Sequence, residues 1–200
     1  MRRRLLLLFF AVIFLTACSS NVANNTPPKP TKSPEEVKKA LSGLIEKRDE
    51  VEEFSAYYAQ TTIDNIGKSD AYVYFIKNKE GIVSDLRFVV NYIGTAQINT
   101  KWIKINADGQ IFEINHADNL IQKSFSYTTV QEVYDSDVYL DDLKMIKAMA
   151  NAKKTIVRCI GGGLYQEDIV LSKRQKQAMQ NVLSAYKNAG GVNELYGDEL

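Results

Sequence analysis

The sequence has little of the chemistry on which most enzymes and metal sites depend. Its 200 residues include one histidine, His116, and two cysteines, Cys18 and Cys159. Protein zinc sites usually need three or four nitrogen and sulfur ligands, which this set does not supply. A catalytic thiol needs a nearby base, and only one histidine is present to act as one. We therefore expect no metal, no cofactor and no catalytic residue.

The sequence also lacks an apolar run long enough to cross a membrane. Leu5–Leu15 holds eleven apolar residues, which as a helix cover about 16 Å, roughly half of a hydrocarbon core. This run follows the basic segment Arg2–Arg4 and ends in the segment Leu15-Thr16-Ala17-Cys18. A basic head, a short apolar segment and small residues at its end are typical of a signal peptide.

The segment Leu15-Thr16-Ala17-Cys18 resembles the lipobox of bacterial prolipoproteins, in which a leucine and two small residues precede a cysteine. The resemblance implies cleavage between Ala17 and Cys18, and attachment of a diacylglyceryl group, often with a further acyl chain, at Cys18. Two or three acyl chains anchor a protein stably, because each buried methylene contributes about 0.8 kcal/mol. Ser19 follows the cysteine. In Gram-negative prolipoproteins an Asp at this position commonly implies retention at the inner membrane. Ser19 therefore favours the outer membrane, facing the periplasm, if the cell is Gram-negative. The alternative is an ordinary secretory signal followed by a chance cysteine.

Proline is confined to one short segment, Pro27–Pro34, and is absent from the following 166 residues. The polar stretch Ser19–Ser33 cannot build a core, and fully extended it reaches about 50 Å at most. Three regions follow from this pattern: a signal peptide at residues 1–17, a lipidated Cys and flexible Pro-rich linker at residues 18–33, and a single domain at residues 34–200.

Neither charge nor disulfide bonding is a dominant feature of the expected mature chain. Removing residues 1–17 takes away three arginines and no acid, so 22 basic residues face 24 acidic ones and the formal charge changes from +1 to −2. A chain without basic excess is not expected to bind nucleic acid.

With Cys18 lipidated, Cys159 has no partner in its own chain. It lies in the strand-like run Thr155–Ile160, where a cysteine is expected to be a small buried hydrophobe.

The segment after the linker is expected to be helical. Ser33 is a good N-cap, Pro34 suits the first helical position, and acidic residues follow in the first turn. Apolar residues then recur at helical spacing as far as Tyr58. This spacing predicts a helix that runs to about Thr62 or breaks in two near Asp49.

A period of two replaces the helical period after Asp70, which indicates antiparallel strands with one buried face. The expected strands are Tyr72–Ile76, Leu86–Tyr92, Lys101–Ile105, Gln110–Ile114 and a more polar region at Ser124–Tyr134. Asp108-Gly109 predicts a tight hairpin, because glycine supplies the positive φ that such a turn requires.

The remainder of the chain predicts a short helix, a second hairpin and a last helix. These are Asp141–Asn151, the strand pair Thr155–Ile160 and Leu164–Leu171, and a helix that opens with the capping box of Ser172 and Gln175 and ends at Gly190-Gly191. The fold class is therefore α+β: an antiparallel β-sheet or sandwich with an N-terminal helix, a short inserted helix and a C-terminal helix. In its hairpin and aromatic spacing this region resembles uncharacterised bacterial lipoproteins of similar size, a resemblance that carries no functional residue with it.

Two groups of residues could be read as active or metal sites. His116 stands next to Asp118, and a His–carboxylate pair can transfer protons, but a solvated turn histidine explains the position better. The acidic stretch Asp135–Asp142 could hold calcium, but Leu140 and Ile146 stand where an EF-hand needs Gly and Glu. We expect Asp141 or Asp142 to cap a helix instead.

Two further motifs have simple structural interpretations. Gly161-Gly162-Gly163 could suggest a phosphate-binding loop, but it leads into a strand rather than a helix, which favours a hairpin turn. Lys173, Arg174 and Lys176 are expected to form the solvated face of the last helix.

These observations favour a non-enzymatic binding or interaction module, tethered to the membrane through lipid on Cys18 and contacting a protein partner of the cell envelope. One alternative is an envelope hydrolase that uses paired carboxylates such as Glu52-Glu53 or Asp141-Asp142. Another is a lipoprotein that excludes a phage or a toxin. Homo-oligomerisation also remains open.

Overall fold

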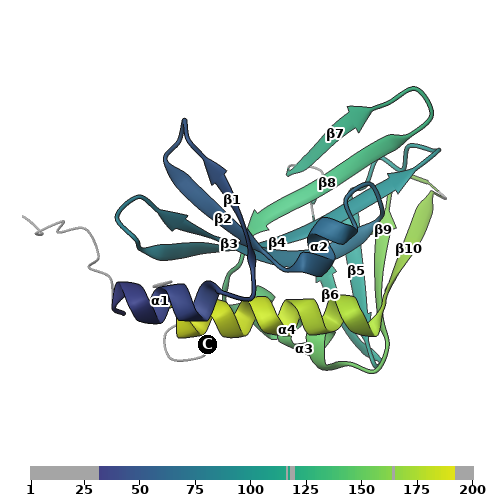
Figure 1. The fold of residues 1–200 in the computed structure, drawn as a ribbon. Coiled ribbons are helices and arrows are strands. Elements are labelled where there is room, and N and C mark those ends of the chain that lie inside the picture. Colours follow the sequence, from purple (N-terminus) through teal and green to yellow (C-terminus); the bar gives the residue numbers. More distant parts are fainter. Residues whose placement is uncertain (1–31, 116, 118–119, 164, 192–200) are drawn as a thin grey trace, which may run out of the picture.

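The computed structural model describes residues 32–115, 117, 120–163 and 165–191, and these form ten strands and four α-helices (Figure 1). Both sheets are antiparallel throughout, and the longest helix closes the described chain. The α+β class with antiparallel sheets and a C-terminal helix is thus confirmed. None of the described helices combines the length and the apolar character that crossing a membrane would require. The predicted lipobox and most of the linker precede the described residues.

A six-stranded sheet forms the centre of the molecule. In spatial order its strands are β1 (Ile45–Asp49), β2 (Phe54–Tyr58), β3 (Asp70–Asn78), β4 (Val83–Gly94), β8 (Val130–Asp137) and β7 (Ile121–Phe125). The β1–β2 and β7–β8 hairpins project from opposite ends of this sheet in Figure 1. β3 and β4 lie between these hairpins and pair along most of their lengths.

A second sheet of four strands packs beside the first. Its spatial order is β10 (Gln166–Leu171), β9 (Thr155–Ile160), β5 (Trp102–Ala107) and β6 (Gln110–Ile114). The β5–β6 turn confirms the predicted hairpin: Asp108 and Gly109 have φ of 51° and 96°, and Gly109 N–H donates to Asn106 Oδ1 at 2.8 Å.

Four α-helices accompany the sheets. They are α1 (Pro34–Leu41), α2 (Gln60–Asp64), α3 (Leu140–Asn151) and α4 (Lys173–Asn188). α4 is the central one, since it contacts β3 and each of the other helices. The predicted capping box is confirmed at its start, where Gln175 N–H donates to Ser172 Oγ at 3.2 Å and Ser172 N–H donates to Gln175 Oε1 at 2.8 Å. Its end is also as predicted, because Gly190 adopts a φ of 78° just after the cap.

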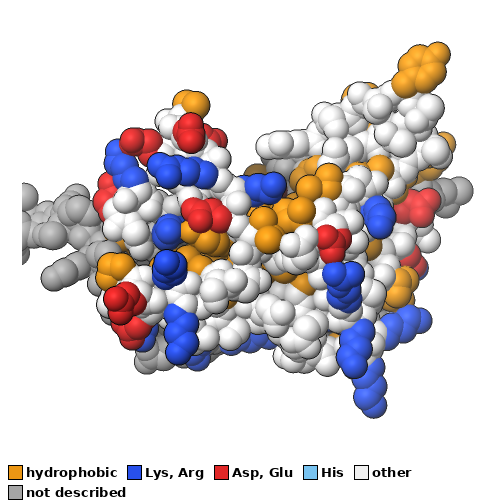
Figure 2. Space-filling view, in the orientation of Figure 1, with side chains coloured by type: hydrophobic (Ala, Val, Ile, Leu, Met, Phe, Trp, Pro, Cys, Tyr) orange, Lys and Arg blue, Asp and Glu red, His pale blue; other side chains and the backbone are white. Residues whose placement is uncertain are grey.

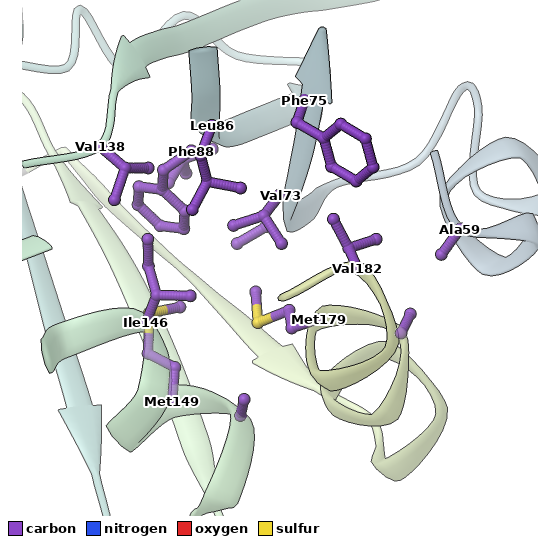
Figure 3. Packing of buried hydrophobic residues seen from close by; sticks show 14 of the residues in the cluster. Ala59, Val73, Phe75, Leu86, Phe88, Val138, Ile146, Met149, Met179 and Val182 are labelled. Carbon is purple, nitrogen blue, oxygen red and sulfur yellow. The ribbon is translucent and has the colours of Figure 1, made fainter. Parts of the chain in front are cut away.

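One hydrophobic cluster joins both sheets to α1, α3 and α4. Figure 3 shows side chains of β3 and β4 meeting those of α3 and α4; the labelled ones include Val73, Phe75, Leu86, Phe88, Ile146, Met149, Met179 and Val182. Each such side chain contributes about 1.5–3 kcal/mol when it is fully buried. The two sheets and these three helices therefore share one hydrophobic core.

The N-terminal helix is shorter than predicted. α1 begins after Ser33 as expected but ends at Leu41, and the chain that was expected to stay helical to about Thr62 forms the β1–β2 hairpin and α2. The chain does turn at Asp49, but between strands: its Oδ1 accepts the N–H groups of Val51 and Glu52 at 2.9 and 3.0 Å.

Tertiary pairing explains this error. Tyr57 of β2 lies opposite Phe75 of β3 in the sheet, and their rings stack with centroids 5.6 Å apart. Aromatic residues are favoured in strands because they pack well across a pleated surface. Val51, which the helical spacing placed on the buried stripe, is 87% exposed at the hairpin tip.

The region predicted as one polar strand at Ser124–Tyr134 is also different in detail. It contains a turn, closed by the Ser126 N–H bond to Thr129 O at 2.8 Å, and so contributes to two strands, β7 and β8.

Candidate functional site

Several of the predicted site residues lie outside the described part of the chain. These are Ala17 and Cys18 of the lipobox, together with His116 and Asp118. The lipidation and cleavage sites therefore stay predictions, and the His–carboxylate pair has no described geometry.

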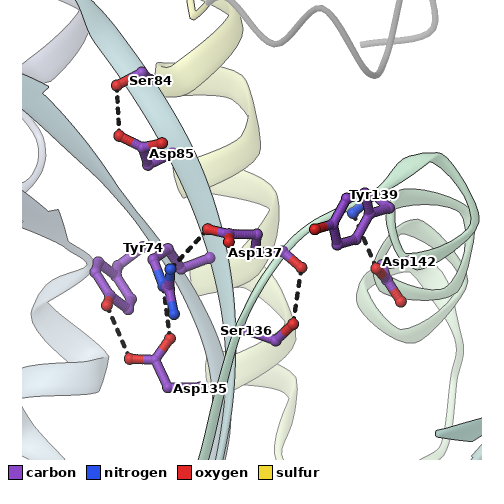
Figure 4. Close-up of polar contacts among 9 residues, drawn as sticks. Tyr74, Ser84, Asp85, Asp135, Ser136, Asp137, Tyr139 and Asp142 are labelled. Carbon is purple, nitrogen blue, oxygen red and sulfur yellow. Dashed lines mark hydrogen bonds and ion pairs between the residues drawn. The ribbon is translucent and has the colours of Figure 1, made fainter. Parts of the chain in front are cut away.

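The acidic stretch does not converge on one point. Asp142 caps α3 as predicted, since its Oδ2 accepts the Tyr139 N–H at 2.9 Å (Figure 4). Asp141 forms an exposed ion pair of 3.4 Å with Lys144. Asp135 and Asp137 instead form ion pairs with Arg87 of the neighbouring strand β4. Among the described residues, no group of three or more His, Cys, Asp or Glu side chains is placed to hold a metal ion.

The glycine motif turns the chain between β9 and β10. Gly161 N–H donates to Tyr165 O at 2.9 Å, and its Cα lies so close to the Ile98 carbonyl that a Cβ would overlap it. A Cβ at Gly162 would meet only the end of the Lys101 side chain, at 3.9 Å. The hairpin interpretation of this motif is confirmed.

The basic residues of α4 differ from the prediction at one position. Lys176 is only 7% exposed, and its ammonium group donates to the carbonyls of Ala152 and Lys153 at 2.7 and 2.6 Å. It therefore joins α4 to the end of α3 instead of facing solvent. Arg174 is exposed and pairs with Asp64 of α2 at 2.8 Å.

Cys159 is a buried hydrophobe, as predicted. It is 2% exposed in the core strand β9, and burial raises the pKa of its thiol to about 12. A thiol in this state is a poor nucleophile, because only the thiolate reacts readily.

Three tyrosines meet on the side of the six-stranded sheet that faces away from α4. Successive residues of a strand point to opposite faces, so Tyr72 and Tyr74 lie opposite the buried Val73 and its neighbours. Tyr58 of β2 stacks on Tyr74, with ring centroids 4.8 Å apart, and meets Tyr72 edge-on at 6.5 Å. All three are half-buried, which leaves part of each ring exposed to solvent.

A charged group borders these rings. Tyr74 OH donates to Asp135 Oδ2 at 2.9 Å, while Arg87 Nε donates to Asp135 Oδ1 at 2.8 Å (Figure 4). The Arg87 guanidinium also bonds Asp137 at 2.6 Å. Tyr58, Tyr72, Tyr74, Arg87, Asp135 and Asp137 are called the tyrosine face below.

The electrostatics of this face fix the protonation state of its hydroxyl groups. Burial, and then the negative charge of Asp135, raise the pKa of Tyr58 and Tyr74. Burial also raises the pKa of Tyr72. The rings therefore remain neutral hydrogen-bond donors at physiological pH.

A cavity of about 300 Å³ adjoins the tyrosine face where α2 lies beside it. It is lined by Tyr58 and Tyr72, by Ile63 of α2 and Ile66 just after this helix, and by Gln131 of β8. Figure 2 shows hydrophobic side chains gathered in the hollow between the two projecting hairpins. The surface is thus aromatic and amphipathic, with a pocket at its edge.

Asp70 also lines this cavity and is buried. Its carboxylate accepts hydrogen bonds from Asn65 Nδ2 at 2.9 Å, from Gln175 Nε2 at 2.6 Å and from the N–H of Ala71. Burial outweighs these bonds and raises the pKa of Asp70. This residue connects α2, β3 and α4 beneath the surface.

Sequence reasoning missed the tyrosine face as a site. The alternation of Tyr72 and Tyr74 with buried residues was visible and indicated a two-sided strand. Tyr58 was assigned to a helix, and Arg87 and Asp135 are 48 positions apart, so only strand pairing brings these residues together.

No protein-family model, no curated protein and no solved structure matches this chain.

Proposed function

We propose that this protein is a lipid-anchored lipoprotein of the cell envelope, and that it acts as a non-enzymatic binding module for a protein partner. In this proposal residues 1–17 are removed, Cys18 carries the lipid, residues 18–33 are the linker, and the domain that follows binds through the tyrosine face. The outer membrane facing the periplasm is the expected location in a Gram-negative cell.

The observation that carries the proposal is the composition of the tyrosine face. Tyrosine and arginine are the residue types that contribute most binding energy at protein interfaces, and aromatic side chains are enriched there. Here three tyrosines and Arg87 lie together on strands of one rigid sheet. Arg87 is held by Asp135 and Asp137 and the rings support one another, so little side-chain entropy remains to be lost on binding.

A tether strengthens this kind of binding. Attachment to the membrane confines the domain to a thin layer next to its partners, which raises their effective concentration without any new contact. The linker preceding Ser33 reaches about 50 Å at most, which is sufficient for the domain to rotate toward a neighbouring protein.

Lipidation is tested by growing cells with radiolabelled palmitate. We expect label in the full chain and none in the Cys18→Ser variant. Equal labelling of both chains would contradict the proposed anchor.

Partner binding is tested by placing a photo-crosslinking amino acid at Gln131, beside the tyrosine face, in living cells. A matched chain carries it at Tyr165, which is exposed in the β9–β10 turn. We expect a discrete protein adduct from Gln131 alone, and its loss when Tyr74→Ala is added. Identical adducts from both positions, or none from Gln131, would refute the assignment of this face.

The same experiment in the Cys18→Ser background separates the face from the tether. A protein that binds through the tyrosine face but needs the membrane to reach its partner loses the adduct in this background. An adduct that persists unchanged shows that the tether contributes nothing to binding.

A further inference from the structure

A cavity of about 790 Å³ lies between α1 and the strands β1, β2 and β3, away from the tyrosine face. Its walls are mainly apolar: Val37 and Leu41 line it from α1, Leu44 from the segment that follows, and Tyr57 from β2. Val37 and Leu41 are four residues apart and so point from the same face of the helix toward the sheet.

The helix beside the cavity, α1, has only eight residues. Phe75 contacts Tyr186 of α4 edge-on at 5.3 Å, so α4 covers the middle of the sheet. Toward the β1–β2 hairpin the same buried side of the sheet is faced by α1 instead. Figure 2 shows hydrophobic side chains in this region, overlain by lysine and acidic side chains.

The charged groups of this cavity lie at its rim. Lys32, Lys38 and Lys77 supply three positive charges, and Glu46 and Glu80 supply two negative ones. None of the three lysines forms an ion pair with the residues that the structure describes, although Lys77 lies 5.3 Å from the ring centre of Tyr57.

The two carboxylates are not equivalent. Glu46 is already engaged, because it accepts the Ser55 hydroxyl at 2.6 Å, and this bond is the largest cause that lowers its pKa. Three lysines against two carboxylates give the rim a net positive charge, although Lys77 already interacts with Tyr57 and Glu46. Lys32 and Lys38 are exposed at the rim and can contact an anion.

We propose that this cavity binds a single acyl chain with an anionic head group, such as a fatty acid. Ligand cavities in proteins usually measure about 300–1,000 Å³ and are lined by apolar residues with a few polar groups that orient the ligand. The acyl chain lies along Val37, Leu41, Leu44 and Tyr57, and the carboxylate meets the lysines of the rim. This site is separate from the tyrosine face and does not depend on the proposed partner.

The chemistry of the walls selects this ligand class. A sugar or a nucleotide would bring many hydroxyl or phosphate groups against apolar walls, where unpaired polar groups are costly. An acyl chain has no such groups, and each methylene that it buries adds affinity.

Calorimetric titration of the full chain tests the proposal. The background is Cys18→Ser, so that no attached acyl chain competes, and the probes are dodecanoate and tetradecanoate. We expect tetradecanoate to bind about 15-fold more tightly, since each buried methylene adds about fourfold. Absence of binding, or equal affinity for the two acids, would overturn the proposal.

Adjacent lysines of α1 provide a matched pair of variants. Lys38 lines the cavity, whereas Lys39 is exposed and does not line it. We expect Lys38→Glu to weaken tetradecanoate binding about fivefold and Lys39→Glu to leave it unchanged. Equal effects of both variants would place the acid elsewhere. Thermal unfolding of each variant checks that the fold is retained.

The chain's own acidic end is the competing occupant. Residues 192–200 include Glu194, Asp198 and Glu199 together with apolar residues. Tetradecanoate binding that appears only after these residues are deleted would assign the cavity to this segment and refute the acyl ligand. Binding by the full chain supports the ligand.

Discussion

Replacing Glu132 with glutamine is expected to destabilise the folded protein by about 2–4 kcal/mol. Glu132 lies on β8 and is 1% exposed. Its Oε1 accepts the N–H groups of Ile98 and Asn99 at 2.9 and 2.7 Å, and its Oε2 accepts that of Thr100 at 2.8 Å. One carboxylate thus satisfies three consecutive backbone donors of the segment that leads into β5.

The magnitude follows from these three bonds. A hydrogen bond to a charged group contributes about 1.5–3 kcal/mol, and an unsatisfied buried donor costs about 1–3 kcal/mol. Glutamine keeps an oxygen for two of the donors but places its NH₂ group against the third. One charge-assisted bond is lost, the other two weaken, and two donors face each other.

The loss is also expected to depend on pH. Burial alone would raise the pKa of Glu132, but the bonds from Thr100, Asn99 and Ile98 outweigh it and hold the pKa below its usual value. A carboxyl group whose pKa is lower in the folded state contributes stability above its unfolded pKa of about 4.3. This stability is lost as the pH falls through the folded pKa. The difference in free energy of unfolding between the wild type and Glu132→Gln therefore becomes smaller below about pH 4.

Urea unfolding followed by circular dichroism measures the free energy of unfolding at pH 7 and in steps down to pH 3.5. Glu167→Gln, on the exposed side of β10, is the matched control and should change stability by less than about 0.5 kcal/mol. A Glu132→Gln protein as stable as this control, or a destabilisation that is constant with pH, would refute the role assigned to the three bonds.

Three further predictions rest on single features of the fold. Because burial raises the pKa of Asp70, the free energy of unfolding of the wild type should rise relative to that of Asp70→Asn as the pH falls through that raised pKa toward the unfolded value of about 3.9, the opposite trend to Glu132. Urea titrations in which the wild type loses stability relative to the variant over this range would contradict the prediction. Gly161→Ala should lower the free energy of unfolding by more than about 2 kcal/mol, since the new Cβ would overlap the Ile98 carbonyl. Gly162→Ala should lower the melting temperature little, and equal melting temperatures of the two variants would show that the turn can shift. Cys159 should resist alkylation in native protein and react in urea, as measured by mass spectrometry of its peptide, and rapid native labelling would disprove its burial.

Turns and helix ends whose stabilising contacts join residues close together in the chain were predictable from sequence. The β5–β6 turn is one example, because Asp108-Gly109 supplies the positive φ values that the turn requires. The start of α4 is another, because Ser172 and Gln175 satisfy the first backbone donors of the helix reciprocally. In both cases the stabilising contacts join residues within a few positions of each other.

Other features depend on residues far apart in the chain. The apolar spacing after Leu41 fits a helix locally, yet pairing of β2 with β3 makes a hairpin there. Glu132 was one polar residue in a strand, and only its approach to residues 98–100 explains its burial. Lys176 looked like a solvated residue until α3 and α4 placed two carbonyls around it.

The sequence by itself determined the α+β class, the bounds of β6, α3 and β9 to within one residue, the turn geometry and the burial of Cys159, since periodicity, capping and turn chemistry act over a few residues. The tertiary structure alone decided that Tyr58, Tyr74, Arg87 and Asp135 share one face, and that a cavity lies between α1 and the sheet. Strand order and helix packing are set by long-range burial of apolar surface, a driving force that is non-directional and leaves no local pattern in the chain.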